Sequence, residues 1–121
     1  MKYKIFEGNV QSALENCLKE KYISATIEEI YQLKKENSEI QEIWKEKWFD
    51  SRNAFNIKTG EIRVFTLKEL KNIEEMYNND WRLIFVGYGD CSNGLSAGSH
   101  LVDDGRFLGI KDKWGRKWIN K

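Results

Sequence analysis

The sequence predicts an α+β fold, in which N-terminal helices precede an antiparallel β-sheet that carries one connector helix. Three observations predict it: apolar residues recur at helical spacing in the first 50 residues, alternate with polar ones around Gly60, and run almost without interruption over 81–88. The chain has 121 residues, a length typical of a single compact domain. Within it, residues 1–50 are expected to form a helical region and residues 51–121 an antiparallel-sheet region.

Two helices are expected in the first 50 residues. Asn9 can cap the first, because its side chain can accept from the free backbone N–H groups of the first turn. Thr26 and Glu29 have the spacing of a capping box, which predicts a second, longer helix running toward Trp48. The apolar face of the first helix is predicted to comprise Val10, Ala13, Leu14, Cys17 and Leu18.

The second helix carries a heptad pattern that predicts contact between subunits. Its apolar residues fall on a and d positions, and Asn37 occupies an a position, where a buried asparagine can set the register of paired helices. The predicted oligomer interface comprises Ile30, Leu33, Asn37, Ile40 and Trp44. The alternative is a helix that lies on its own sheet, with Asn37 exposed.

The second half of the chain is predicted to form the sheet. Residues 55–57 and 61–64 alternate around a turn containing Gly60, which indicates a β-hairpin. Thr66 and Glu69 form a second capping box, and the helix that they begin should bury Leu67, Leu70, Ile73 and Tyr77. Residues 81–88 are expected to form a central strand covered on both faces, and residues 107–110 to pair with 117–119.

Charge and composition exclude several classes of protein. No apolar run approaches the ~20 residues that span a bilayer, and the start MKYKIFEGN lacks the apolar stretch of a signal peptide. We therefore expect a cytoplasmic protein with reduced cysteines. The formal charge is only +1, which argues against nucleic-acid binding, yet residues 105–121 hold six basic residues against Asp112, a local +5. This segment suits a small anionic ligand; the alternative is a solvated basic edge strand.

The segment 89–100 is predicted to be a polar binding loop. It is long and rich in Gly and Ser, and it matches neither GxxxxGK[ST] nor GxGxxG, so we expect no cofactor. Cys91, His100 and Asp103 are residue types of a nucleophilic triad, but all lie in one loop, where geometry is hard to hold. Metal-ligand spacings are absent too. We therefore expect neither an enzyme nor a metal site.

A binding site for a small anionic nucleotide agrees better with the sequence. Such a ligand needs a stacking surface for its base, donors for its sugar and cations for its phosphates. The alternative for Phe85 is a place in the core, because it lies within the apolar run. The candidate ligand-binding residues are Phe85, Tyr88, Asn93, Ser99, His100, Arg106, Trp114 and Arg116, with Trp118 as a further stacking residue.

The chain resembles the first Thoeris anti-defence family, small phage proteins known as sponges, in its order of elements and in four segments. These are IWKEKWFD (43–50), GEIRVFTLKEL (60–70), WRLIFVGYGD (81–90) and RFLGIKDKWGRKW (106–118). The resemblance implies a homodimer or larger homo-oligomer in the bacterial host cytoplasm. It further implies sequestration, without cleavage, of a cyclic ADP-ribose-type signal, glycocyclic ADP-ribose-like, in pockets at a subunit interface.

Two other functions remain open from the sequence. An anti-CRISPR-like inhibitor would bind a protein face and would also suit a composition dominated by Lys, Asn, Ile and Glu. A single-strand nucleic-acid binder would use Trp114, Arg116, Lys117 and Trp118, but the low overall charge argues against it.

Overall fold

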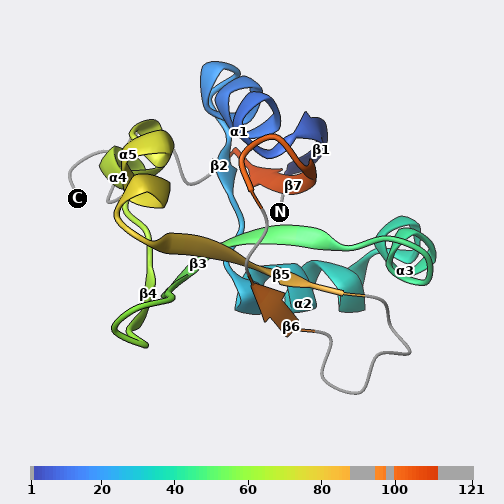
Figure 1. Cartoon of the computed structure of the whole chain (residues 1–121). Helices are drawn as coiled ribbons and strands as arrows, with labels where there is room; N and C mark the ends of the chain where they lie inside the picture. Colours follow the sequence, from blue (N-terminus) through green and yellow to red (C-terminus); the bar gives the residue numbers. More distant parts are fainter. Residues whose placement is uncertain (1, 88–94, 98–99, 112–121) are drawn as a thin grey trace.

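The computed structural model describes residues 2–87, 95–97 and 100–111, and these form the α+β fold that the sequence predicts (Figure 1). In chain order the elements are β1 (Tyr3–Asn9), α1 (Val10–Lys19), β2 (Ile23–Ser24), α2 (Ile27–Glu36), α3 (Ser38–Trp44), β3 (Phe49–Asn56), β4 (Ile62–Val64), α4 (Leu67–Lys71), α5 (Ile73–Asn78), β5 (Trp81–Val86), β6 (Leu95–Ala97) and β7 (Asp104–Ile110).

The strands of the described residues join in one mixed sheet. Its main order is β1-β7-β3-β5-β6, while β2 pairs with β7 and β4 with β3. The pairs are antiparallel except β3 and β7, which run parallel and meet at Asp50 and Phe107. Beyond this point Ala25 bridges the two strands, because its N–H donates to Leu108 and its carbonyl accepts from Arg52. The prediction of a wholly antiparallel sheet is therefore wrong at the β3–β7 pair.

Strand β1 is an element that the sequence prediction missed. It comes from residues assigned to the helical region, yet it pairs with β7 along its whole length, from Tyr3 opposite Ile110 to Asn9 opposite Asp104. The boundary at residue 50 therefore does not separate helices from sheet. β7, predicted to pair with 117–119, instead lies between β1 on one side and β2 and β3 on the other; residues 117–119 lie outside the described residues.

The predicted helix caps are confirmed. Asn9 accepts a hydrogen bond from the N–H of Ser12, and α1 begins at the next residue. Thr26 and Thr66 each form a complete capping box with the glutamate three residues later. Since these caps satisfy donors that the first helical turn leaves free, short local patterns suffice to determine where the helices start.

The single long helix predicted from Thr26 toward Trp48 is wrong. The helix ends at Asn37, whose φ of −129° and ψ of 117° are extended, and α3 begins at the next residue. The Asn37 side chain donates to the carbonyl of Leu33, which also accepts from the Asn37 backbone N–H. Residues 49–56, partly assigned to that helix, form β3.

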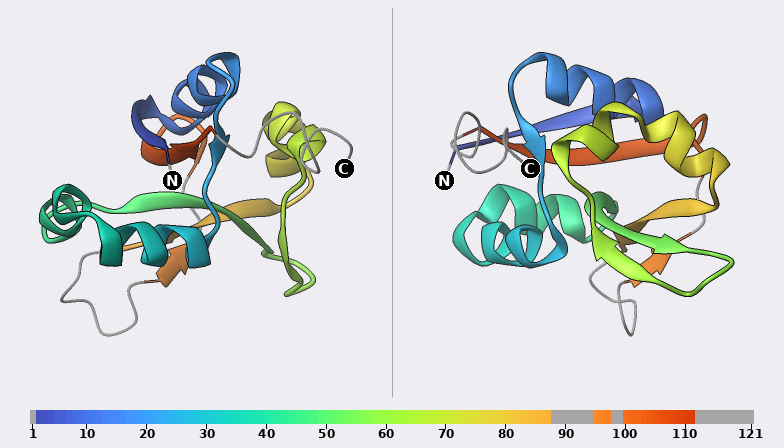
Figure 2. Two further views of the ribbon diagram at one scale, coloured as in Figure 1. Left: turned by 180° about the vertical axis from the view of Figure 1, so that it is seen from behind. Right: turned by 90° about the vertical axis from the view of Figure 1, so that its left-hand side faces the viewer.

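Two hydrophobic clusters lie against the sheet. Figure 2 shows α1 and the α4–α5 pair on one side of β3 and β5, and α2 and α3 on the other. One cluster joins α1, α4 and α5 to β1, β5 and β7, and includes the predicted Leu67, Leu70, Ile73 and Tyr77. The other joins α2 and α3 to β3, β5 and β7. β5 was predicted to be covered on both faces, but Arg82, Ile84 and Phe85 are only half-buried.

The predicted oligomer interface is used by the chain's own core. Ile30, Leu33 and Ile40 have no exposed surface, and Trp44 is 2% exposed, all within the α2–α3 cluster. Asn37, half-buried, turns its amide back onto α2. Side chains buried in their own subunit offer no surface to another, so the assignment of Ile30, Leu33, Ile40 and Trp44 to an interface is wrong. The interface role of Asn37 and self-association itself stay predictions.

Gly109 is a position in β7 where the packing excludes a side chain. A Cβ built there would lie 2.8 Å from both a Phe6 ring carbon and the Tyr22 Cβ, and 3.0 Å from the Cys17 sulfur. We therefore expect Gly109→Ala to lower the free energy of unfolding by about 1–3 kcal/mol, the usual cost of overpacking. Urea denaturation monitored by circular dichroism measures this, and an unchanged midpoint would contradict the packing.

Candidate functional site

Two of the predicted ligand-binding residues, Phe85 and Arg106, lie close to the ring of Trp48. The Arg106 guanidinium carbon is 5.8 Å from the centre of the Trp48 ring, and this ring is 6.1 Å from that of Phe85. Both aromatic side chains are half-buried. The arrangement is a cation beside a partly exposed aromatic pair, which suits a planar ring or an anionic group.

Arg106 is held by two elements in addition to its own strand. Its Nη1 donates to the Trp48 carbonyl at 3.1 Å, its Nη2 donates to a Glu7 carboxylate oxygen at 3.4 Å, and its Nε lies 3.3 Å from the other oxygen. The Arg106 side chain is 12% exposed and that of Glu7 is 54% exposed. The hydrogen bond and charge of Arg106, together with the charge of Lys47, lower the pKa of Glu7 despite its partial burial.

Asp50 is a buried acid at the point where β3 meets β7. Its Oδ2 accepts a hydrogen bond from the Arg106 backbone N–H at 2.9 Å, while Oδ1 has no hydrogen-bond partner among the described residues. Burial raises the pKa of Asp50 to about 7, although the hydrogen bond and charge of Arg106 act in the opposite direction. Since Asp50 has no exposed surface, it acts as a positioning residue that holds the backbone of Arg106.

A recess of about 250 Å³ opens at this end of β1 and β7. It is lined by Glu7, Gly8, Trp48, Asp104, Gly105 and Arg106. Gly105 allows the close approach of neighbouring chain, because a Cβ there would lie 2.9 Å from the Val10 Cα and 3.2 Å from Asp50 Oδ2. The two acids and one base of the lining carry a formal charge of −1. An anion entering the recess therefore has to replace a carboxylate at Arg106.

His100, also predicted to bind ligand, belongs to a turn before β7 and is exposed. Its backbone N–H donates to Asp103 Oδ2 at 2.8 Å, and its carbonyl accepts from the Asp103 N–H. The Asp103 carboxylate thus stabilises the turn through the backbone of His100. The remaining predicted ligand-binding residues, together with Cys91, lie outside the described residues: Tyr88, Asn93, Ser99, Trp114 and Arg116.

The sequence prediction missed Glu7, Trp48 and Asp50. Glu7 lies in a strand that was not predicted, and the other two were assigned to the end of a helix. The sequence did carry one signal, in FDSRNAFN (49–56). Four consecutive polar residues at 50–53 interrupt the alternation of polar and apolar residues that a regular strand would show, and such an interruption can mark a site. A buried carboxyl of raised pKa beside a recess is a common feature of functional sites.

The described part of the chain carries neither a metal-binding cluster nor a membrane-spanning helix. Over residues 2–87, 95–97 and 100–111, no group of three His, Cys, Asp or Glu side chains is placed to hold a metal ion. Cys17 is buried, and this burial raises the pKa of its thiol to about 12. Within the same residues, no helix combines the length and apolar character needed to cross a membrane.

The comparisons with known proteins leave the residues of the site as the basis for a functional assignment. No protein-family model, curated protein or solved structure matches the chain.

Proposed function

We propose that this chain is a non-catalytic binding protein that captures a small anionic nucleotide at the recess beside Arg106. The observation that carries the proposal is the half-buried Arg106 guanidinium, held against the Trp48–Phe85 aromatic pair at that recess. Guanidinium groups bind phosphates through paired hydrogen bonds, and an aromatic surface stacks bases. Both functions are therefore available within one small volume.

Binding of an anion at Arg106 would proceed by exchange with Glu7. The exposed Glu7 carboxylate already contacts the Nε and Nη2 groups that a phosphate would use. Glu7 can turn out to solvent because its side chain is 54% exposed, and the incoming phosphate would take its place at the more buried Arg106 guanidinium. The backbone of Arg106 would stay fixed by Asp50, and its Nη1 by the Trp48 carbonyl.

The size of the recess limits which part of the ligand it holds. Its volume of about 250 Å³ is below the ~300–1,000 Å³ of sites that enclose a drug-sized molecule. It therefore accommodates a phosphate or a base, and the rest of a nucleotide would extend outside. The resemblance to the anti-defence sponges supports a cyclic ADP-ribose-type ligand, with a second subunit completing the pocket.

Thermal unfolding with a panel of cyclic nucleotides and ADP-ribose isomers tests this function. A ligand at 100 times its dissociation constant should add about 2.7 kcal/mol of stability. Arg106→Ala should remove this gain. Glu7→Gln should strengthen binding several-fold, because it removes the carboxylate that competes with the ligand while keeping an uncharged side chain of the same length.

Lys111→Ala is the matched control, since it removes one positive charge just after the other end of β7, where Lys111 is exposed and lies over Tyr22. This variant should keep the ligand-dependent gain. Recovery of intact ligand after heating the complex would distinguish capture from hydrolysis. If no member of the panel stabilises the chain, the proposed function is rejected. If Glu7→Gln weakens ligand binding as much as Arg106→Ala does, the exchange of Glu7 for the ligand at Arg106 is rejected.

A further inference from the structure

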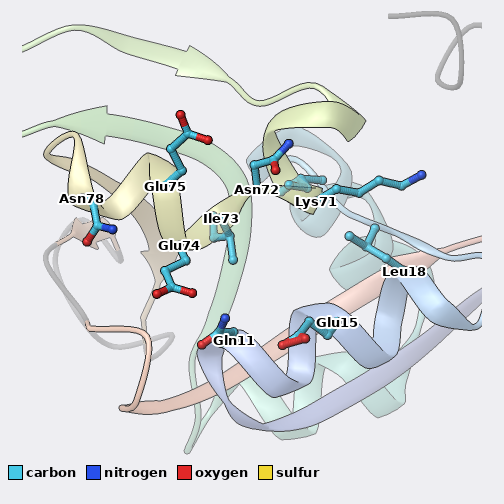
Figure 3. A pocket seen from close by; sticks show the side chains of 10 residues that line it. Gln11, Glu15, Leu18, Lys71, Asn72, Ile73, Glu74, Glu75 and Asn78 are labelled. Atoms are coloured by element: carbon cyan, nitrogen blue, oxygen red, sulfur yellow. The ribbon is translucent and has the colours of Figure 1, made fainter.

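A second and larger cavity lies between α1 and the α4–α5 pair, away from the Arg106 recess. Its volume is about 400 Å³, within the range of sites for small molecules or single side chains of a partner. Figure 3 shows the open space between the two walls, with Gln11 and Glu15 on one side and Ile73 and Glu74 on the other. We call this cavity the α1–α5 groove.

The base of the α1–α5 groove is apolar. Leu18, Leu70 and Ile73 line it, and all three belong to or pack against the larger hydrophobic cluster. Leu70 and Ile73 are almost completely buried, so they are held firmly in place. Leu18 is only half-buried, so an alkyl chain lying over it would remove apolar surface from water beside neighbours that are already fixed in place.

The two walls of the α1–α5 groove each present a carboxylate. Glu15 on α1 and Glu74 on α5 both line the groove, and their side chains point into the gap in Figure 3, whereas Glu75 points away from it. Within the described residues, neither the Glu15 nor the Glu74 side chain makes a hydrogen bond or an ion pair. With Glu75 and Lys71 counted, the lining has three acids and one base, a formal charge of −2.

Side-chain amides complete the rim. Gln11, Asn72 and Asn78 line the groove together with the carboxylates. The Asn72 Nδ2 donates to the Lys68 carbonyl, which leaves its oxygen as an acceptor. Amides carry both donors and acceptors and so match the peptide group, whereas a free polyamine offers donors alone. The rim therefore favours a peptide over a small organic cation.

We propose that the α1–α5 groove binds a lysine- or arginine-bearing peptide segment of a partner protein. The alkyl stem of the basic side chain lies over the half-buried Leu18, and its cationic head lies beside Glu15 and Glu74. The rim amides bond to the peptide backbone. Charge complementarity determines the class of partner, because Glu15 and Glu74 both line the groove and neither carboxylate has an ion pair within the described residues. This site is separate from the Arg106 recess and does not depend on the function proposed there.

Fluorescence anisotropy with the full chain tests this proposal, using a labelled peptide of alternating lysine and alanine as the probe. The peptide should bind at low ionic strength, and the double variant Glu15→Gln/Glu74→Gln should weaken binding about tenfold, or about 1.4 kcal/mol. A peptide of alternating glutamate and alanine should not bind. Leu18→Ser should also weaken binding, since it removes part of the apolar base without changing any charge.

The matched control is Glu46→Gln/Glu61→Gln, which changes the net charge by the same amount at two exposed sites outside the groove. It should bind the lysine peptide as the unmodified chain does. If both double variants bind the lysine peptide equally weakly, the peptide is attracted only by the overall charge of the chain, and the proposal is overturned. Spermidine bound as tightly as the peptide, with the same loss in Glu15→Gln/Glu74→Gln, would overturn the assignment to a peptide. Circular dichroism of each variant confirms that it is folded.

Discussion

Replacing Trp44 by alanine should lower the free energy of unfolding by about 3–5 kcal/mol, the usual cost of removing a large aromatic side chain from a core. Trp44 is 2% exposed, and its ring lies 5.2 Å from that of Tyr31 and 6.1 Å from that of Phe49. A small domain has only about 5–15 kcal/mol of stability, so the variant should be marginal. Urea denaturation measures the loss.

The same substitution distinguishes a core residue from an interface residue. If Trp44 is a core residue, Trp44→Ala should reduce stability without changing the association state of the folded chain, which light scattering measures. Lys45→Ala is the control at the next position, because Lys45 is exposed and its ion pair with Glu42 joins two exposed side chains. A stable, folded Trp44→Ala monomer derived from an oligomeric unmodified chain would restore the interface assignment.

Asp50 should make stability fall as the pH rises. Its pKa is about 7 in the folded chain, against 3.8 for the free group. Between these values the folded state keeps the proton that the unfolded state releases, so rising pH favours unfolding. Three pKa units correspond to about 4 kcal/mol, lost progressively from about pH 4 to pH 7 and constant above.

Asp50→Asn removes this titration and isolates its effect from those of the other carboxylates. Relative to the unmodified chain, the variant should gain stability between pH 4.5 and pH 7.5, as measured by urea denaturation at each pH. Asp104→Asn removes an exposed carboxylate from the start of β7 and should not reproduce the gain. A difference between Asp50→Asn and the unmodified chain that is the same at both pH values would contradict the burial of a protonated acid.

Local chemistry made several elements predictable. Asn9, Thr26 and Thr66 cap helices in the structure as their sequence context predicts, since a cap depends only on residues within one turn. The hairpin around Gly60 is confirmed for a similar reason. Gly60 has a φ of +78°, a conformation that glycine adopts without strain.

Elements that depend on distant partners could not be predicted in the same way. Residues 3–9 become β1 because β7 pairs with them along their whole length, although the numbers of the paired residues differ by 95 or more. The break at Asn37 likewise arises where α2 and α3 both fold onto the sheet. A heptad pattern records which residues are apolar but not what covers them, so the pattern suited a core as well as an interface.

In the candidate site, too, some residues could be predicted from the sequence, whereas others were brought in only by contacts between distant parts of the chain. Phe85 and Arg106 were identified from chemistry alone, as an aromatic residue and a cation that suit a nucleotide. Trp48, which joins them, and Asp50, which holds Arg106, were brought there by the meeting of β3 with β7. No local pattern contains that meeting, because the two strands are parallel and lie far apart in the chain.

The sequence by itself therefore determined the α+β class, the helix starts, the hairpin and the kinds of side chain available for binding. These depend on capping, periodicity and turn conformation, which act over a few residues. Only the tertiary structure decided that Trp44 is core, that Asp50 is buried with its pKa raised to about 7, and that Glu15 and Glu74 line one groove. Burial and electrostatic environment are produced by long-range packing, and the same residue types can be exposed or enclosed until that packing is formed.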